Sequence, residues 1–171
     1  MLNKIIQDWG IDNSWTLFLD RDGVINHEKP NEYITKVVDF KFIDGVLESI
    51  AELSAIFGKI VVVTNQQGIG KGLMTEKDFS EITEYMLSEI VKAGGRIDKV
   101  YHSPYLSELN HELQKPRTGM AKQAKIDFPE IDFSKSVMIG NGERDMEFGK
   151  AVMQEKPGRE LVWTKADLSL V

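Results

Sequence analysis

Short apolar runs that alternate with segments of helical periodicity constrain the fold of this chain more than any other feature. The runs are rich in β-branched residues and end in polar residues, which is typical of buried strands. Strands and helices in alternation need crossover connections, which make a sheet mostly parallel and cover both of its faces. We therefore expect an α/β fold with a three-layer, doubly wound, Rossmann-like parallel sheet. The runs occupy positions 15–19, 59–63, 100–101, 137–139 and 161–163.

Local signals set the expected ends of the helices. Asp44 is a candidate N-cap for a helix over 46–57, in which apolar residues recur at helical spacing. Thr75 is a candidate N-cap for a helix that runs to about residue 92, and Asp78 stands where a capping-box acid belongs. Further expected boundaries are the helix-ending glycines 94–95, helix starts near 118 and 144, and a peripheral helix within 1–13.

Length and composition indicate one globular domain over residues 1–171. The chain has 171 residues and 42% hydrophobic residues, and domains of this kind average roughly 150 residues. There is no cysteine, which excludes a disulfide framework, a thiolate zinc site, an iron–sulfur cluster and a cysteine nucleophile.

The charge and hydropathy pattern restricts the expected partners and location. Lys plus Arg number 21 and Asp plus Glu number 27, so the net charge is −6, which disfavours binding to nucleic acid or an anionic membrane. No apolar stretch approaches the roughly 18 residues of a membrane span, and residues 1–10 do not resemble a secretory signal. We expect a cytoplasmic protein that is a monomer or a small homo-oligomer.

The first apolar run ends in Asp20-Arg21-Asp22-Gly23. In parallel sheets ligands bind beyond the carboxyl ends of the strands, so this is where chemistry is expected. Two carboxylates one residue apart can hold a magnesium ion through oxygen, or supply a nucleophile and a proton donor side by side. A plain polar turn is the alternative. A calcium-binding loop is excluded because Val24 would occupy its fifth position.

Polar motifs suited to phosphate follow at other strand ends and helix starts. Thr64 and Asn65 close the second run and precede a glycine-rich loop over 66–72, so hydroxyl, amide and backbone donors can reach phosphate oxygens. Lys115, fixed by Pro116 at a helix start, is a point charge suited to the same ligand.

A fourth polar motif, Gly-Asn-Gly-Glu-Arg-Asp over 140–145, follows the fourth run. An acidic or amide oxygen from it could face Asp20 across neighbouring strand ends. Taken singly, each of the four motifs is also typical of a turn, a flexible connection or a solvated surface lysine. Together they indicate a site that handles phosphate or a cation.

These four motifs, in this order, resemble those of the haloacid dehalogenase (HAD) superfamily of phosphohydrolases. The matching segments are 18–26, 62–66, 115–116 and 140–145. The residues within these motifs most resemble those of the branch of D-glycero-D-manno-heptose 1,7-bisphosphate phosphatases and histidinol-phosphatases. The resemblance covers about residues 15 to 153.

The resemblance implies a mechanism and a set of site residues. Asp20 would attack phosphorus to form an aspartyl-phosphate, and Asp22 would act as general acid and then general base. Thr64, Asn65 and Lys115 would hold the phosphoryl oxygens. The short spacings between the motifs leave no room for a large cap domain, which favours a small phosphorylated metabolite or a terminal phosphate on something larger. Mg²⁺ would be held by Asp20, the Asp22 carbonyl, and the fourth-motif residues Asn141 and Asp145.

Three departures from the branch modify these expectations. Asn141 stands where the branch has a metal-binding aspartate, so we expect weaker magnesium binding, with Asp145 or Glu143 partly compensating. Gln114 stands where the heptose enzymes have arginine, so a second substrate phosphate would need another partner. Of the zinc-loop positions 103, 105, 111 and 113, His111 alone is a possible ligand, so no structural zinc is expected.

The sequence therefore favours a magnesium-dependent phosphomonoester hydrolase acting on a small sugar phosphate, with the heptose bisphosphate first. Three alternatives remain open: a histidinol-phosphate phosphatase, a polynucleotide 3′-phosphatase, and a phosphate-ligand binding module that has lost turnover through Asn141.

Overall fold

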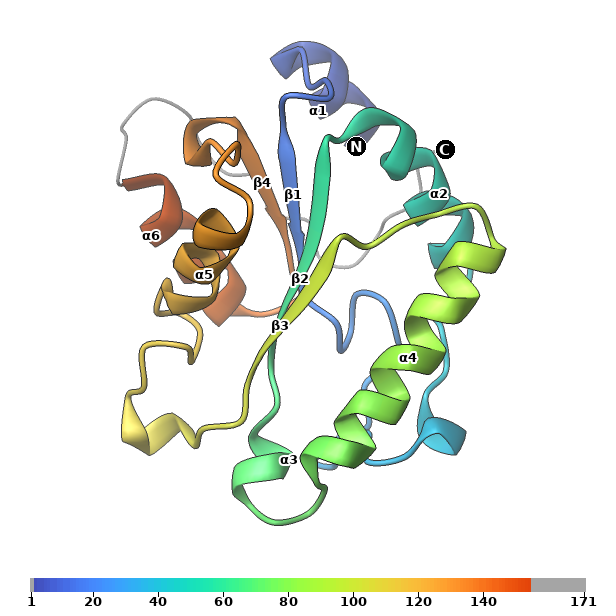
Figure 1. Cartoon of the computed structure of the whole chain (residues 1–171), viewed down its shortest axis with the longest axis vertical. Helices are drawn as coiled ribbons and strands as arrows, with labels where there is room; N and C mark the ends of the chain where they lie inside the picture. The colour runs from blue at the N-terminus through green and yellow to red at the C-terminus, as the bar shows by residue number, and fades with distance from the viewer. Residues whose placement is uncertain (1, 155–171) are drawn as a thin grey trace.

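The computed structural model describes residues 2–154 of the chain. Within them, four parallel strands form one sheet in the order β3-β2-β1-β4 (Figure 1). Four of the predicted apolar runs are thus confirmed as strands, whereas the run at 161–163 lies outside the described residues. The strands are β1 (Thr16–Leu19), β2 (Lys59–Asn65), β3 (Lys99–Ser103) and β4 (Ser136–Ile139).

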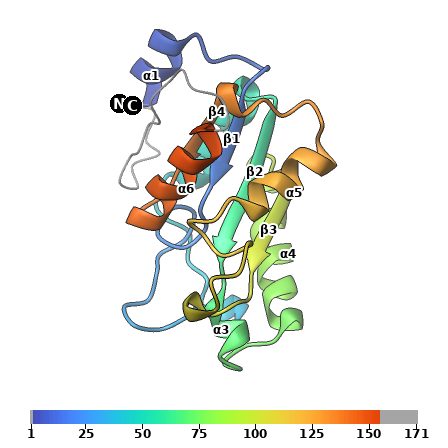
Figure 2. The same ribbon diagram turned by 90° about the vertical axis from the view of Figure 1, so that its left-hand side faces the viewer.

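Helices cover both faces of the sheet, which makes the predicted three layers. Figures 1 and 2 show α2 and α4 on one face and α5 and α6 on the other. The helices are α1 (Leu2–Trp9), α2 (Val46–Ile56), α3 (Gln67–Gly70), α4 (Glu76–Lys92), α5 (Gly119–Asp127) and α6 (Glu143–Gln154). Short 3-10 turns lie at Val37–Asp39, Ser107–Leu109 and Phe133–Lys135.

The alternation of side chains along β1 assigns the two hydrophobic cores. Leu17 and Leu19 point to the face that α2 and α4 cover, and Phe18 points to the face that α5 and α6 cover. Successive side chains of a strand point to opposite faces, and both faces are buried here. This explains why the strands are continuous apolar runs instead of alternating ones.

Of two predicted helix N-caps, one is confirmed and the other is wrong. The capping box at Thr75 is present, because its hydroxyl accepts from the Asp78 N–H and the Asp78 carboxylate accepts from the Thr75 N–H. The prediction of Asp44 as an N-cap is wrong, since Gly45 occupies that position with a φ of 78°. The left-handed backbone there suits glycine, and the turn that it makes moves the helix start one residue along.

The remaining boundaries agree with the predictions to within a residue or two. Helix α4 ends at Lys92, and Gly94 follows with a φ of 86°. Helix α5 has Thr118 as its N-cap, and α6 begins at Glu143. No helix of the described part, residues 2–154, is long and apolar enough to cross a bilayer.

The two ends of the sheet differ in character. The carboxyl ends of the strands meet at the lower edge in Figure 1, where α3 follows β2. The polar motifs predicted from the sequence therefore gather at this edge.

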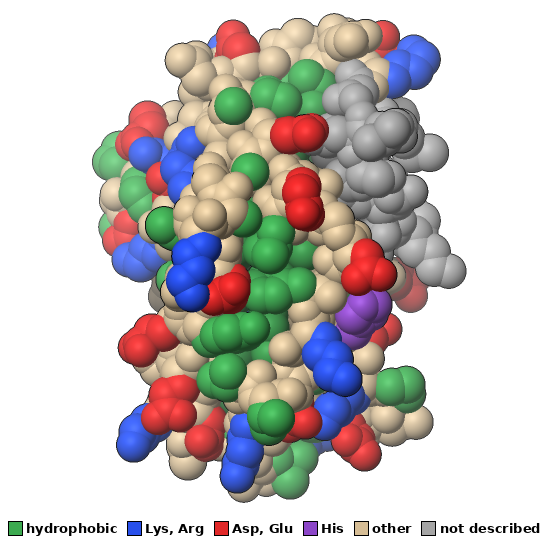
Figure 3. Space-filling model, turned by 90° about the vertical axis from the view of Figure 1, so that its right-hand side faces the viewer, with side chains coloured by type: hydrophobic (Ala, Val, Ile, Leu, Met, Phe, Trp, Pro, Cys, Tyr) green, Lys and Arg blue, Asp and Glu red, His purple; other side chains and the backbone are tan. Residues whose placement is uncertain are grey.

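The face formed by α2 and α4 carries acidic and basic side chains on both sides of an apolar stripe (Figure 3).

Candidate active site

Asp20 is the first residue after β1 and stands at the centre of the carboxyl edge. Its backbone N–H continues the ladder to β4 by donating to the Ile139 carbonyl at 2.9 Å. Its Oδ1 accepts from the Arg21 N–H at 2.7 Å. The chain then turns at Gly23, whose φ is 78°. The Asp20 carboxylate, which is 14% exposed, thus lies at the carboxyl edge of the sheet just before this turn.

Lys115 joins two of the predicted motifs to Asp20. Its Nζ lies 3.0 Å from Asp20 Oδ1 and 2.5 Å from Asp145 Oδ1, and the lysine side chain is only 2% exposed. The other oxygen of Asp145 accepts from the Gly142 N–H at 3.1 Å. The first, third and fourth motifs therefore meet at one buried ammonium group, as their positions at the strand ends predicted.

The protonation of this cluster follows from burial and charge. Burial raises the pKa of Asp20 to about 6, with Asp145 and Asp22 adding to the rise and Lys115 opposing it. Burial alone would lower the pKa of Lys115, but the Asp20 and Asp145 carboxylates outweigh it and the pKa is raised. Lys115 therefore carries a positive charge where a phosphate dianion would need one.

The carboxylate of Asp22 is held by three other side chains. Arg21 Nη2 donates to both of its oxygens at 2.9 and 3.0 Å, Asn26 Nδ2 donates at 2.9 Å, and Gln66 Nε2 donates at 2.8 Å. Burial would raise the pKa of Asp22, but the Arg21 charge and these hydrogen bonds lower it overall. Asp22 is thus stabilised as an anion, beside Asp20 and not in contact with Lys115.

Arg21 and Gln66 are site residues that the sequence reasoning did not single out. Arg21 is fully buried, and its guanidinium lies 6.0 Å from the ring centre of Phe40 and 5.7 Å from that of Phe79. Gln66 connects Asp22 to Thr64, to whose Oγ1 it donates at 3.0 Å. A charged residue between two aspartates just after a buried strand was the available signal, because a guanidinium buried there can pair with the neighbouring carboxylate.

Thr64 and Asn65 end β2 next to these groups, with different surroundings. Thr64 is 1% exposed and accepts from Gln66. Asn65 accepts from the Lys115 N–H at 2.9 Å through Oδ1 and donates to the Lys115 carbonyl at 3.2 Å through Nδ2. The structure thus gives Asn65 a contact that the sequence did not predict, namely a brace on the backbone of the site lysine.

Asn141 lies against the turn that follows Asp22. A Cβ added at Gly23 would stand 1.9 Å from Asn141 Nδ2 and 3.3 Å from its Oδ1. Among the described residues no group of three or more acidic, His or Cys side chains could hold a metal ion. The Asp20 carboxylate, the Asp22 carbonyl and the Asn141 amide oxygen are hard oxygen donors of the type that magnesium accepts. The donor set fits magnesium, with a neutral amide oxygen at position 141 where an aspartate would supply a second carboxylate.

The loop over 104–114 contains the four positions compared with a zinc loop. The ring of Tyr105 stacks on that of His111 with centres 3.5 Å apart, and Leu113 packs on the core beneath α5 and α6. Leu109 of the same loop is 61% exposed. An aromatic stack therefore holds the two ends of this loop together, and the absence of a zinc ion stays a prediction.

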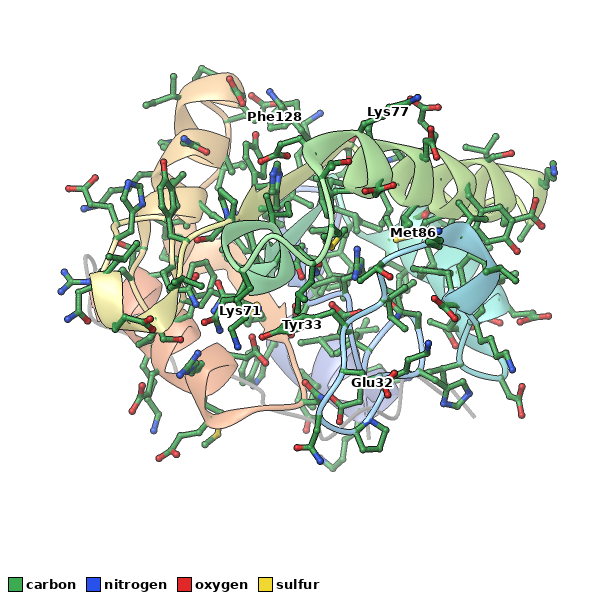
Figure 4. All side chains as sticks on the ribbon, turned by 90° about the horizontal axis from the view of Figure 1, so that it is seen from below. Glu32, Tyr33, Lys71, Lys77, Met86 and Phe128 are labelled. Atoms are coloured by element: carbon green, nitrogen blue, oxygen red, sulfur yellow. The ribbon has the colours of Figure 1, made fainter. Side chains whose placement is uncertain are left out.

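Figure 4 views the site edge from below. Lys71 at the end of α3 and Tyr33 lie side by side there, with Lys71 Nζ 5.3 Å from the Tyr33 ring centre. Hydrogen bonding to Tyr33 raises the pKa of Lys71. The segment that carries Tyr33 thus packs against helix α3, and α3 also contacts the loop over 104–114 where Gly70 approaches Pro104.

Known proteins resemble this chain in sequence. The family model described as polynucleotide kinase 3 phosphatase matches residues 16–156. The D-glycero-alpha-D-manno-heptose-1,7-bisphosphate 7-phosphatase of Campylobacter jejuni is 42% identical over 133 residues, which are 78% of this chain and 74% of that protein. The D-glycero-beta-D-manno-heptose-1,7-bisphosphate 7-phosphatase of Photorhabdus laumondii is 36% identical over 138 residues, which are 77% and 72% of the two chains.

Solved structures agree with the sequence comparison. The D,D-heptose 1,7-bisphosphate phosphatase from B. bronchiseptica, complexed with magnesium and phosphate, has a TM-score of 0.76 at 22% identity and covers 90% of this chain and 93% of its own. The D,D-heptose 1,7-bisphosphate phosphatase from Burkholderia thailandensis has a TM-score of 0.57 at 29% identity, over 81% and 73% of the two chains. The predicted HAD-like fold is confirmed, and the chain belongs to the HAD-type phosphatase family that includes the heptose-1,7-bisphosphate 7-phosphatases.

Proposed function

We propose that this chain is a magnesium-dependent phosphomonoester hydrolase that removes the 7-phosphate of D-glycero-D-manno-heptose 1,7-bisphosphate. The observation that carries the proposal is the carboxylate of Asp20, partly exposed at the carboxyl edge with the buried Lys115 ammonium 3.0 Å away. A nucleophilic oxygen and a fixed positive charge this close suit in-line attack on a phosphoryl group. The names of relatives at 36 and 42% identity support the choice of substrate.

The residues divide the reaction into two steps. A carboxylate oxygen of Asp20 attacks phosphorus and the bond to the sugar oxygen breaks, while Asp22 gives that oxygen a proton. Water then attacks the aspartyl-phosphate, Asp22 takes a proton from the water, and inorganic phosphate leaves with Asp20 restored. The sum is ester plus water giving alcohol plus phosphate.

The contacts of Asp22 fit this double role. Arg21, Asn26 and Gln66 stabilise its anion, which is the form that accepts a proton from water. A phosphate dianion arriving beside Asp22 raises its proton affinity by like-charge repulsion, which favours the acid form needed in the first step. Gln66 also bonds Thr64, so the acid–base residue and one predicted phosphate ligand share a donor.

Magnesium would be held by the Asp20 carboxylate, the Asp22 carbonyl and the Asn141 side-chain oxygen. The Asp145 carboxylate, also predicted as a ligand, is paired with Lys115. When bound, a divalent cation supplies charge neutralisation for the transferring phosphoryl group. Lys115 supplies a second positive charge from the protein itself. We propose that the reaction takes place in the cytoplasm and on a soluble metabolite.

Phosphate release from a substrate panel tests the proposal. The panel holds the heptose bisphosphate, histidinol phosphate, hexose phosphates and a 3′-phosphorylated oligonucleotide, each at low and high magnesium. We expect the heptose bisphosphate to give the highest kcat/KM and Asp20→Asn to abolish release. Asp12→Asn, at an exposed residue before β1, is the matched control and should retain activity. Release that persists in Asp20→Asn would refute the mechanism, and binding of phosphate without turnover would favour a binding module.

A polynucleotide 3′-phosphatase is the second candidate, because the description of the family model that matches residues 16–156 names that activity. A nucleic-acid substrate calls for a basic groove. The net charge is −6, and the face in Figure 3 intersperses acidic and basic side chains. Hydrolysis of the oligonucleotide that exceeds that of every sugar phosphate and falls steeply with salt would favour this candidate.

A further inference from the structure

The side-chain amide of Gln66 is held in one orientation by its neighbours. Its Oε1 accepts from Arg21 Nη2 at 3.2 Å. A guanidinium has donors and no acceptor, so only the oxygen end of the amide can face it. The Nε2 of Gln66 faces the other way and donates to Asp22 Oδ2 at 2.8 Å and to Thr64 Oγ1 at 3.0 Å. Turning the amide over would place a donor against Arg21 and an acceptor against the Asp22 carboxylate.

The groups that orient this amide are themselves fixed. The Gln66 N–H donates to the Ser103 carbonyl at the end of β3 at 2.7 Å, and Gln66 is 2% exposed. Arg21 is fully buried, and its Nη2 also donates to both carboxylate oxygens of Asp22. The amide of Gln66 is therefore a donor whose direction is set by the protein before a ligand arrives.

This orientation determines where the Thr64 hydroxyl can donate. A hydroxyl has one hydrogen to donate and lone pairs that accept. Because Thr64 Oγ1 accepts from Gln66, its hydrogen points elsewhere, and residues 2–154 offer that hydrogen no acceptor. Thr64 is 1% exposed, and a buried donor without an acceptor is rare in folded proteins. The hydrogen is available to an oxygen of a bound ligand.

Thr64 also stands beside the residue that would attack phosphorus. Leu19 of β1 pairs with Val62 of β2 in the parallel register. Asp20 follows this pair by one residue on its strand, and Thr64 follows it by two on the neighbouring strand. A phosphoryl group that meets the Asp20 carboxylate would bring its other oxygens next to the Thr64 hydroxyl.

We propose that Gln66 is a positioning residue: oriented by the buried Arg21, it fixes the Thr64 hydroxyl as a donor to the phosphoryl oxygens. The proposal rests on the proposed function, because it concerns how the same site holds the phosphate that is removed. A donor fixed in advance needs no reorientation when the phosphate arrives, which is how preorganised groups stabilise developing charge. Arg21 thereby affects phosphate binding without touching the phosphate.

A double-mutant cycle on the binding of inorganic phosphate tests this role. Calorimetry at saturating magnesium compares the wild type, Gln66→Met, Thr64→Val and the double variant. We expect Gln66→Met to weaken phosphate binding about threefold to tenfold, the range of one hydrogen bond. In the Thr64→Val background, where no hydroxyl remains to be oriented, the effect should fall below about twofold. The same loss in both backgrounds would overturn the proposal.

Three further variants complete the cycle. Thr64→Ser keeps a hydroxyl and should keep the dependence of phosphate affinity on Gln66. Gln66→Leu, which also lacks a donor, gives the same measurement if Gln66→Met does not fold. Gln123→Met, at an exposed glutamine of α5, is the matched control and should leave phosphate affinity unchanged. A lower kcat with unchanged phosphate affinity in the Gln66 variants would assign Gln66 to Asp22 alone and overturn the proposal.

Phosphate binding separates this proposal from the proposed function, because it needs no turnover of a sugar phosphate. If the wild type binds phosphate but hydrolyses none of the panel, the proposed function fails and the cycle still decides the role of Gln66. If the wild type binds no phosphate at saturating magnesium, both are refuted.

Discussion

The side chain of Asn65 brackets the backbone of Lys115: Oδ1 accepts from the lysine N–H at 2.9 Å and Nδ2 donates to the lysine carbonyl at 3.2 Å. Asn65 ends the central strand β2, and Lys115 belongs to the connection that leads into α5. The sheet thereby fixes the backbone of Lys115 relative to Asp20, which directly follows the neighbouring strand β1. The position of the lysine depends on a contact fifty residues away in sequence.

Asn65→Ala removes this bracket, and we expect kcat to fall by about ten- to a hundredfold because misplacement of a site group is costly. The free energy of unfolding should fall by about 1–3 kcal/mol, since buried backbone groups lose their partners. Urea titration and steady-state kinetics measure the two effects.

Asn65→Asp distinguishes a brace from a direct phosphate ligand. It keeps the acceptor for the Lys115 N–H, so a brace predicts that Asp is more active than Ala at position 65. A residue that mainly contacts phosphate predicts the reverse order, because a carboxylate repels the substrate dianion. The rank of the two variants decides between the roles.

Asn141→Asp should strengthen magnesium binding. The side chain lies against the Gly23 turn beside Asp20 and Asp22, and an added carboxylate raises the affinity of an oxygen site for a divalent ion. We expect the magnesium concentration for half-maximal activity to fall by about tenfold or more. Gln123→Glu adds the same charge on an exposed part of α5 and should leave it unchanged. Wild-type saturation already at low micromolar magnesium would contradict the prediction.

The pKa of Asp20 predicts a specific pH dependence of stability in the metal-free protein. Burial raises this pKa from 3.8 to about 6, so the folded state holds a proton that the unfolded state releases. The contribution of Asp20 to stability is therefore present below pH 3.8 and is lost as pH rises through about 6. Relative to Asp20→Asn, the wild type should lose about 3 kcal/mol between pH 3.5 and 7, the free-energy equivalent of this shift. If the free energies of unfolding of the two proteins change with pH by the same amount across that range, the prediction is wrong.

Arg21→Met should be among the most destabilising single changes at this edge. It leaves the Asp22 carboxylate without its bidentate partner, and because Asp22 is 29% exposed the cost should lie at the lower end of the roughly 3–5 kcal/mol for breaking a buried ion pair. Exposed Lys77→Met serves as the control, with an expected effect within about 0.5 kcal/mol.

A double-mutant cycle with Asp22→Asn shows whether that loss comes from the pair. In the Asp22→Asn background, Arg21→Met should cost about 1–3 kcal/mol less than in the wild type, because no unpaired charge remains. Additive losses in urea unfolding would mean that Arg21 stabilises the fold through Phe40 and Phe79 instead of through Asp22.

The layered fold and most of the candidate site residues follow from the pattern of residue types along the chain. Apolar runs buried on both faces can be satisfied only inside a helix-covered parallel sheet, and such a sheet brings the residues after its strands to one edge. Asp20 and Thr64, at the ends of two apolar runs, were predicted in this way, and Lys115 was predicted from its place at a helix start. Local rules also gave the capping box at Thr75, because its hydrogen bonds span three residues.

The pairing of side chains at that edge became known only from the folded chain. The bracket of Asn65 on Lys115, the buried Arg21 behind Asp22, and the contact of Asn141 with Gly23 join residues from different motifs. Hydrogen bonds and ion pairs act over a few ångströms, so they depend on the register and twist of the strands, which residue types do not encode singly. The unpaired Nε2 of Gln114, which lines a cavity together with Arg117 and Arg144, became visible for the same reason.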